Sequence, residues 1–322
     1  MACFLHTASA CRSPWTHWVH GLLFLFQMDF FPMSALRTTS LVAACLLGLA
    51  GCASQPAATP SPAPAVPQGA IKGTVTQHTP QSLQAAISKA WVSLPASVTG
   101  GAPYHGLYSD APAARSRAPV MVFVHGSGGI NPMIKEFQKW AAESLGIASI
   151  TADSMQLKDR ITYKSPIPKA DYEVVHALRA AELQATIAAL PAMAFADSTR
   201  MVIAGTSEGA VAVARYQAAA SAPQEKGRLI LSWSCEDNYH VQSHQTQLPT
   251  TLPVLNVVSS TDIYFSRINS WLGNPSALGH CGEALKENKV SSIVMISGAP
   301  HTLFNLPQAR QPIEGFLKAV LK

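Results

Sequence analysis

The alternation of apolar strands with longer amphipathic segments limits most strongly how this chain can fold. Runs such as Val120–His125 and Arg200–Thr206 are short, β-branched and almost continuously apolar, as strands covered on both faces are. Longer segments such as Asn131–Leu145 and Ala170–Leu190 gather their apolar residues on one face, as amphipathic helices do. The alternation predicts an α/β fold with a mostly parallel central sheet and helices on both faces.

The remaining predicted elements continue this pattern. Further strands are expected at Ala90–Val98, Tyr104–Ser109, Ile147–Asp153, Leu229–Ser234, Val254–Ser259 and Ser292–Ser297, and further helices from Glu208 onward and at Ile313–Leu321. The polar segment Ser154–Lys169, which holds two prolines, is expected to be a loop. Ligand sites in parallel sheets lie at the carboxyl ends of the strands, so residues that directly follow strands are the candidate functional residues.

The start of the chain is interpreted as an export signal preceded by extra sequence. Residues 1–32 lack a basic start and carry Asp29, which indicates an over-extended gene start rather than a domain. Residues 33–51 form the predicted signal peptide, with an apolar run at Leu41–Gly51. That run is shorter than the roughly 20 apolar residues that a membrane-spanning helix needs, and its length is typical of a secretory signal.

The signal ends in Leu49-Ala50-Gly51-Cys52, which resembles the lipobox of bacterial lipoproteins. In that family the cysteine is lipidated and becomes the mature N-terminus. An ordinary signal peptide that happens to end near a cysteine is the alternative. The resemblance, with Ala53 rather than aspartate after the cysteine, implies an outer-membrane lipoprotein that faces the periplasm.

Residues 52–68 and 69–322 are interpreted as a tether and a single catalytic domain. The first segment is Pro-rich and uncharged, which is typical of semi-rigid linkers. The second has the length of one α/β domain with a sizeable core, expected to act as a monomer. The net charge of +5 is mild and no Lys/Arg cluster occurs, so a nucleic-acid partner is not expected.

Cys235 and Cys281 are the cysteines that remain in the predicted mature domain. An even pair in an oxidising compartment favours one disulfide, with two separate thiols as the alternative. His240 and His244 form an H-x-x-x-H pair near Cys235 that is a weaker candidate for a zinc site, because no full set of ligands with a known spacing is present.

The segment Gly205-Thr206-Ser207-Glu208-Gly209 joins a predicted strand to a predicted helix and matches the G-x-S-x-G nucleophile elbow. In this motif the serine occupies a sharp turn, and only small residues fit two positions to either side. The helix begins at the serine, so free N–H groups lie near the hydroxyl. Ser207 is therefore the predicted nucleophile.

A serine hydroxyl needs a base, and the base needs a carboxylate that orients it. Among the downstream histidines His240, His244, His280 and His301, only His301 directly follows a predicted strand. Asp262 also follows a strand and is the predicted acid, with Glu236 and Asp237 as rivals after the preceding strand. Ser207, Asp262 and His301 stand in the order Ser…Asp…His.

The stretch His125-Gly126-Ser127-Gly128-Gly129 follows a predicted buried strand, where flexible glycines can turn N–H groups toward the serine. We expect the amides of Ser127 and Glu208 to form an oxyanion hole, and His125 to hold the loop by a hydrogen bond. Arg160 and Tyr163 are candidate contacts for an anionic substrate at the rim of the pocket, with a solvated loop as the alternative reading.

Together these motifs resemble the α/β-hydrolase superfamily. The segments "DSMQLKDRITYK" and "YEVVHALRAAELQAT" are similar to its dienelactone hydrolase-related branch. True dienelactone hydrolases use a cysteine nucleophile, and the serine here favours an esterase. The resemblance implies hydrolysis of a small-molecule ester without a cofactor. A peptidase or amidase, an acyltransferase and a non-catalytic binding lipoprotein remain alternatives.

Overall fold

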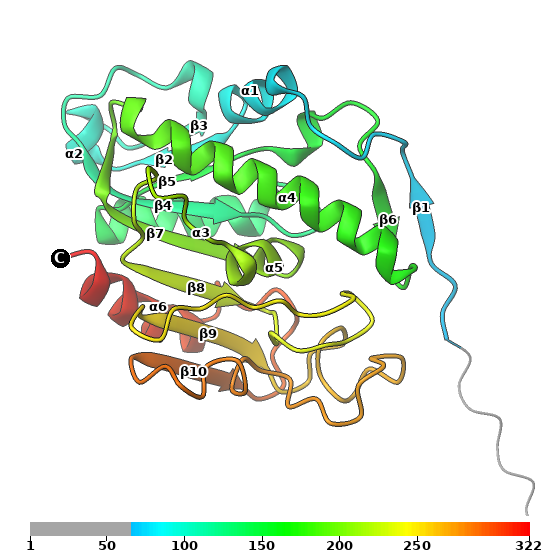
Figure 1. The fold of residues 1–322 in the computed structure, drawn as a ribbon. Helices are drawn as coiled ribbons and strands as arrows, with labels where there is room; N and C mark the ends of the chain where they lie inside the picture. The colour runs from blue at the N-terminus through cyan, green and yellow to red at the C-terminus, as the bar shows by residue number, and fades with distance from the viewer. Residues whose placement is uncertain (1–65) are drawn as a thin grey trace, which may run out of the picture. The chain divides into compact units, whose positions relative to one another are not determined.

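The computed structural model describes residues 66–322 (Figure 1). The predicted signal peptide, Cys52 and most of the Pro-rich tether lie outside these residues, so the predictions of export and lipidation stay predictions. Within residues 66–322, no helix is long and apolar enough to cross a membrane.

An eight-stranded sheet with the order β10-β9-β8-β7-β4-β5-β2-β3 forms the centre of the domain (Figure 1). Its strands are β2 (Trp91–Leu94), β3 (Tyr104–Leu107), β4 (Ala118–Val124), β5 (Ala148–Thr151), β7 (Ala196–Thr206), β8 (Gly227–Leu231), β9 (Val254–Ser259) and β10 (Ser291–Ile296). From β10 to β5 all neighbours are parallel, whereas β2 is antiparallel to both β5 and β3. The predicted, mostly parallel sheet is confirmed.

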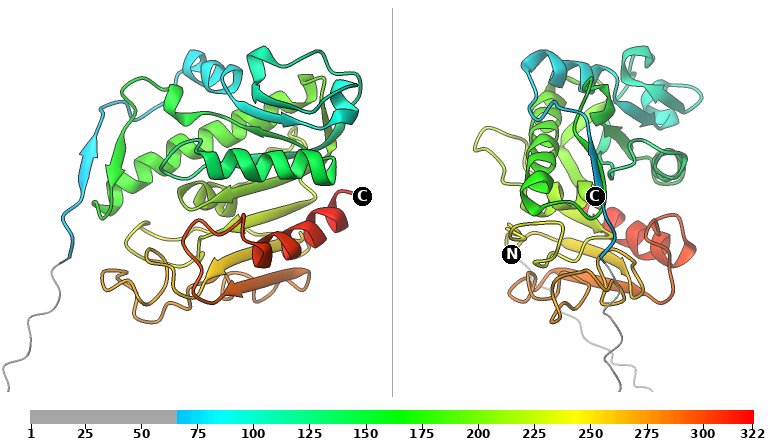
Figure 2. Two further views of the ribbon diagram at one scale, coloured as in Figure 1. Left: turned by 180° about the vertical axis from the view of Figure 1, so that it is seen from behind. Right: turned by 90° about the vertical axis from the view of Figure 1, so that its right-hand side faces the viewer.

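Helices cover both faces of this sheet, as predicted (Figure 2). The helices are α1 (Pro80–Ser88), α2 (Ala96–Thr99), α3 (Pro132–Leu145), α4 (Lys169–Ala189), α5 (Glu208–Arg215) and α6 (Pro307–Val320), and short 3₁₀ turns lie at Tyr108–Asp110, Ser154–Gln156 and Leu190–Ala192. α4 and α5 pack on one face through one apolar cluster, and α3 and α6 pack on the other face through a second.

Local sequence explains the strongest elements. All residues of β4 except Pro119 are buried, which fits its continuous apolar run and its place between two helix layers. The Asn131 side chain accepts from the Ile134 amide and so caps α3, and Pro132 occupies the first turn. Gly146 ends α3 in the left-handed region with φ of 68°.

The structure differs from the sequence prediction mainly around the segment that was expected to be a loop. Within it, β6 (Thr162–Lys164) pairs antiparallel with β1 (Ala70–Lys72), the first strand of the described chain. α1 was not predicted either. The predicted strand at Ala90–Val98 is shorter, because Pro95 ends it and α2 begins at the next residue.

Candidate active site

Ser207 lies at the turn between β7 and α5, with φ of 55° and ψ of −123°. Such a positive φ is strained for a residue that carries a Cβ. A Cβ on Gly205 would lie 2.7 Å from the Gly209 carbonyl oxygen, and a Cβ on Gly209 would lie 2.2 Å from the Val124 carbonyl oxygen. The two glycines are therefore required sterically, because strand and helix pack backbone to backbone on either side of the serine.

His301 and Asp262 form a close pair at the same edge of the sheet. Asp262 follows β9 and His301 follows β10, and His301 Nδ1 lies 2.7 Å from Asp262 Oδ2. The other carboxylate oxygen of Asp262 accepts from the amides of Tyr264 (2.8 Å) and Phe265 (3.0 Å). The Tyr264 ring packs edge-on against the imidazole, with 4.7 Å between ring centroids. Carboxylate and aromatic ring together fix the orientation of the imidazole.

The alternative acids Glu236 and Asp237 and the alternative base His244 form hydrogen bonds with other groups. Glu236 accepts from the amides of Leu278 and Gly279, and Asp237 accepts from the His244 amide. His244 Nδ1 lies 2.9 Å from the Thr246 hydroxyl. Of the three candidate carboxylates, Asp262 alone is hydrogen-bonded to His301.

Two backbone N–H groups beside the serine have no protein acceptor. Among the described residues, the amides of Ser127 and Glu208 donate to no backbone carbonyl. Glu208 is the first residue of α5, where a helix leaves its N–H groups unpaired. The loop that carries Ser127 passes close to Ser207, since a Cβ on Gly126 would lie 3.4 Å from the Ser207 Cβ.

A cavity of about 430 Å³ opens over these groups. Ser127, Ser207 and His301 line it, and its walls include the rings of Tyr163, Tyr239, His240, Tyr264, Phe265 and Phe304. The His301 side chain is 17% exposed, so a molecule in the cavity can reach it. Among the described residues, the Ser207 side chain has no hydrogen-bond partner. Lys164, His240 and His301 are the basic side chains that line the cavity with it, and His301 is the one hydrogen-bonded to Asp262.

The Glu208 side chain is buried and has partners of its own. Its carboxylate accepts from Arg160 Nη2 at 3.0 Å and from the Tyr163 hydroxyl at 2.8 Å. Arg160 is buried and is absent from the cavity lining, so it is a structural partner of Glu208 and does not contact the cavity. Tyr163 does line the cavity. Burial, and then the charge of Glu208, raise the pKa of Tyr163 well above its ordinary value, so the phenol keeps its proton.

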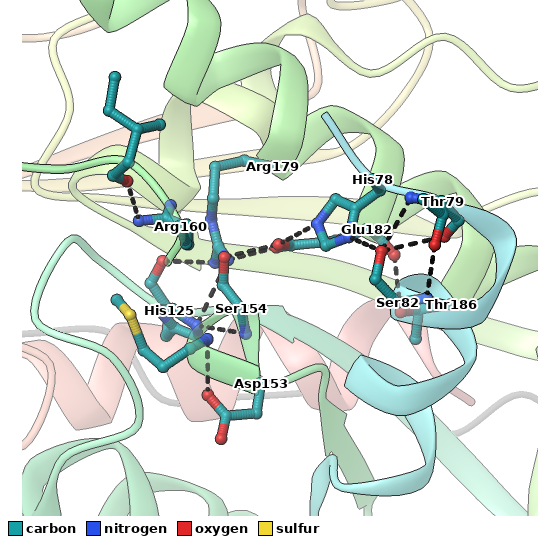
Figure 3. A network of polar contacts seen from close by, with 12 residues as sticks. His78, Thr79, Ser82, His125, Asp153, Ser154, Arg160, Arg179, Glu182 and Thr186 are labelled. Atoms are coloured by element: carbon teal, nitrogen blue, oxygen red, sulfur yellow. Dashed lines mark hydrogen bonds and ion pairs between the residues drawn. The ribbon is translucent and has the colours of Figure 1, made fainter. Parts of the chain in front are cut away.

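A buried polar network lies behind the loop of residues 125–129 (Figure 3), and the sequence analysis predicted only the hydrogen bond from His125 to this loop. His125 Nδ1 donates to the Gly126 carbonyl at 2.7 Å, and His125 Nε2 accepts from the Ser154 amide at 3.2 Å. Burial and the nearby Arg179 lower the pKa of His125 to about 3, so the ring is neutral. Arg179 and Glu182 are themselves paired. Both interrupt the apolar stripe of α4, and this interruption was the available signal in the sequence.

The predicted disulfide between Cys235 and Cys281 is present, with 4.7 Å between the Cα atoms. It links the loop after β8 to the connection between β9 and β10, on which Asp262 lies. Within residues 66–322, no three His, Cys, Asp or Glu side chains gather into a group that could hold a metal ion. His240 Nε2 instead lies 3.0 Å from the Tyr163 hydroxyl.

No protein-family model and no curated protein matches the chain. Several solved structures resemble it at low identity. Est1E from Butyrivibrio proteoclasticus is 16% identical with a TM-score of 0.42, covering 72% of this chain and 92% of its own. A dienelactone hydrolase-like promiscuous phosphotriesterase from metagenomic libraries is 15% identical with a TM-score of 0.46, covering 72% and 98%. Esterase PE8 is 14% identical with a TM-score of 0.44, covering 71% and 97%.

These likenesses concern the fold alone. The sheet order, the antiparallel β2 and the strand–turn–helix at Ser207 agree with the predicted architecture. The fold is an α/β-hydrolase fold.

Proposed function

We propose that the protein is a serine hydrolase that cleaves carboxylic esters through a covalent acyl-enzyme. The observation that carries this proposal is the pairing of His301 with Asp262 at 2.7 Å, together with the cavity that His301 and the strained Ser207 both line. A nucleophile, a base and an acid that orients the base are the three roles that acyl transfer to serine requires.

In the first half of the reaction His301 Nε2 takes the proton of the Ser207 hydroxyl as Oγ attacks the ester carbonyl carbon. The carbonyl oxygen becomes an oxyanion, and collapse of this intermediate breaks the bond to the alcohol oxygen, to which His301 returns the proton. Water then repeats the sequence on the acyl-enzyme and releases the acid. Asp262 accepts a hydrogen bond from Nδ1–H of His301 throughout and stabilises the imidazolium that forms in each half. The hydrogen bond between serine and histidine is often long in free enzymes and tightens when substrate binds.

The amides of Ser127 and Glu208 are the proposed donors to the oxyanion. Their lack of backbone acceptors among the described residues supports this role, because the N–H groups then need not break a bond before they stabilise the charge. The aromatic walls of the cavity favour an uncharged organic group on either side of the ester bond. Tyr163, whose hydroxyl faces Glu208 and His240, remains a proposed substrate contact.

We also propose that the enzyme is exported and anchored by a lipid at Cys52, facing the periplasm from the outer membrane. The lipobox-like sequence supports this location. The buried disulfide agrees with it, since disulfides form and persist in oxidising compartments.

The test is covalent labelling with a fluorophosphonate together with turnover of p-nitrophenyl esters of increasing acyl length. Wild-type protein should be labelled and active, and Ser207→Ala should lose labelling and about 10⁴–10⁶ of the rate. Near-normal ester turnover by Ser207→Ala would overturn the proposal. Parallel assays with anilides and with alcohol acceptors would reveal a peptidase or an acyltransferase.

A further inference from the structure

One buried guanidinium contacts both segments that carry the proposed oxyanion donors. Arg179 lies on α4 and is fully buried. Its Nη2 donates to the His125 carbonyl at 2.8 Å, and its Nη1 lies 3.3 Å from His125 Nε2 (Figure 3). Its Nε lies 3.4 Å from Glu208 Oε1, which is an ion-pair contact without hydrogen-bond geometry.

The two contacted residues lie just beyond the carboxyl ends of two different strands of the sheet. His125 follows β4 and stands two residues before Ser127, whereas Glu208 follows Ser207 at the end of β7. An oxyanion hole works only if both N–H groups point at one place, about 2.7–3.1 Å from the developing charge. We propose that Arg179 is the positioning residue of the oxyanion hole, fixing the loop of Ser127 relative to the amide of Glu208. This inference rests on the proposed esterase function.

The surroundings of Arg179 are built to hold the guanidinium in place. Glu182, one turn along α4, pairs with Arg179 Nη1 and also accepts from His78 Nε2 at 2.8 Å and from the Ser154 hydroxyl at 2.5 Å. Burial raises the pKa of Glu182, but the charge of Arg179 and these hydrogen bonds outweigh it and lower the pKa to about 2. Glu182 is therefore charged at neutral pH and keeps Arg179 compensated.

The Glu208 carboxylate, which Arg179 contacts, is also held in place. Arg160 and the Tyr163 hydroxyl both bond to the Glu208 carboxylate, so this side chain cannot turn away from Arg179. Two guanidinium groups and two carboxylates thus balance one another in a region closed to water. In a cluster without net charge, the attraction between the opposite charges offsets the desolvation penalty that each buried ion pays.

Arg179→Lys tests the inference because it keeps the charge but removes the planar fork. One ammonium group cannot make both contacts at once, so the two donors should lose their alignment. A misplaced N–H donor weakens binding of the transition state but does not change binding of the substrate in its ground state. We expect kcat to fall by about 10–100-fold with KM within about 2-fold of wild type.

Glu208→Gln removes the carboxylate that Arg179 contacts and keeps the backbone amide of residue 208. It should show the same loss of kcat at constant KM. Arg215→Lys is the matched control: Arg215 ends α5, makes two hydrogen bonds to Glu173 at 2.7 and 3.1 Å, and does not line the cavity. Its kcat should equal that of wild type. Active sites are counted by completed fluorophosphonate labelling, so that kcat refers to folded enzyme.

These measurements distinguish a failure of this inference from a failure of the proposed function. Unchanged kcat per site in Arg179→Lys or Glu208→Gln would overturn the inference, and so would a parallel rise in KM. If both variants are unfolded at the assay temperature, the network is a folding element and the inference is also wrong. Absence of wild-type turnover and labelling would instead refute the proposed function itself, before any variant is compared.

Discussion

Gly209→Ala tests the steric account of the nucleophile elbow. The new methyl carbon would lie 2.2 Å from the Val124 carbonyl oxygen and 2.5 Å from that of His125. Ordinary carbon–oxygen contacts begin above 3 Å, so α5 would have to move away from β4 by roughly 1 Å. Both obstacles are backbone atoms, one in the last residue of the central strand β4 and one in the residue that follows it, and neither can rotate aside.

The expected losses of stability and of activity follow from that displacement. Overpacking of a core costs typically about 1–3 kcal/mol, and two rigid carbonyl groups place Gly209→Ala at the upper end of that range. A 1 Å shift of a catalytic group costs about 10²-fold in rate, because Ser207 and the amide of Glu208 would move with the helix. We therefore expect a loss of about 3 kcal/mol in the free energy of unfolding and about 10²-fold in kcat/KM.

Urea denaturation measures the first quantity and p-nitrophenyl ester turnover the second. Gly315→Ala is the matched control, since a Cβ there meets no atom within 4 Å and the residue lies inside α6. That variant should keep full activity and gain about 0.5–1 kcal/mol from higher helix propensity. The steric reasoning fails if Gly209→Ala is as stable and as active as wild type.

Four further predictions follow from the site and its surroundings. Asp262→Asn should keep the fold and lower ester turnover by about 10⁴-fold, because the histidine loses the acceptor that fixes its tautomer; a loss below tenfold would contradict the assignment. Reduction of Cys235–Cys281 should lower the free energy of unfolding by about 4 kcal/mol, since the bond closes a loop with a sequence separation of 46; equal denaturation midpoints with and without reductant would refute this. Acid should destabilise the protein, because burial and Arg179 lower the pKa of His125 to about 3 while the unfolded value is about 6.5. As the pH falls below 6.5 the unfolded state takes up the proton first, so about 2 kcal/mol should be lost between pH 7 and pH 5, and equal stability at both would count against a neutral, buried ring. Cys52→Ser should abolish membrane association in cell fractionation, and wild-type protein found soluble with its leader intact would rule out the lipid anchor.

Local sequence patterns are sufficient to predict a feature where a single strand and the residue after it determine that feature. The strands that end near Ser207, Asp262 and His301 were recognised from short apolar runs. A parallel sheet then brings their carboxyl ends to one edge without any further information. Asp262 and Glu236 both follow strands, so this rule alone leaves both as candidates, and the structure places Asp262 against His301.

Features that depend on distant partners could not be predicted in this way. β1 and β6 are each three residues long, and they become strands only because they pair with each other across the sequence. The polar neighbours of Arg160 in the sequence predict a place at the rim of the pocket or in a solvated loop. Its burial comes from Glu208, which lies 48 residues away, and no local periodicity reports such a pairing.

The balance of charge behind the loop of residues 125–129 also limits which substitutions this sequence can accept. Arg160, Arg179, Glu182 and Glu208 are all buried, with two positive and two negative groups in contact. Loss of any one leaves an uncompensated ion, which costs about 3–5 kcal/mol, a large share of the stability of a natural domain. Viable descendants must therefore keep all four or replace them in oppositely charged pairs. Among related sequences, these positions should covary, although they are scattered over nearly 50 residues of the chain.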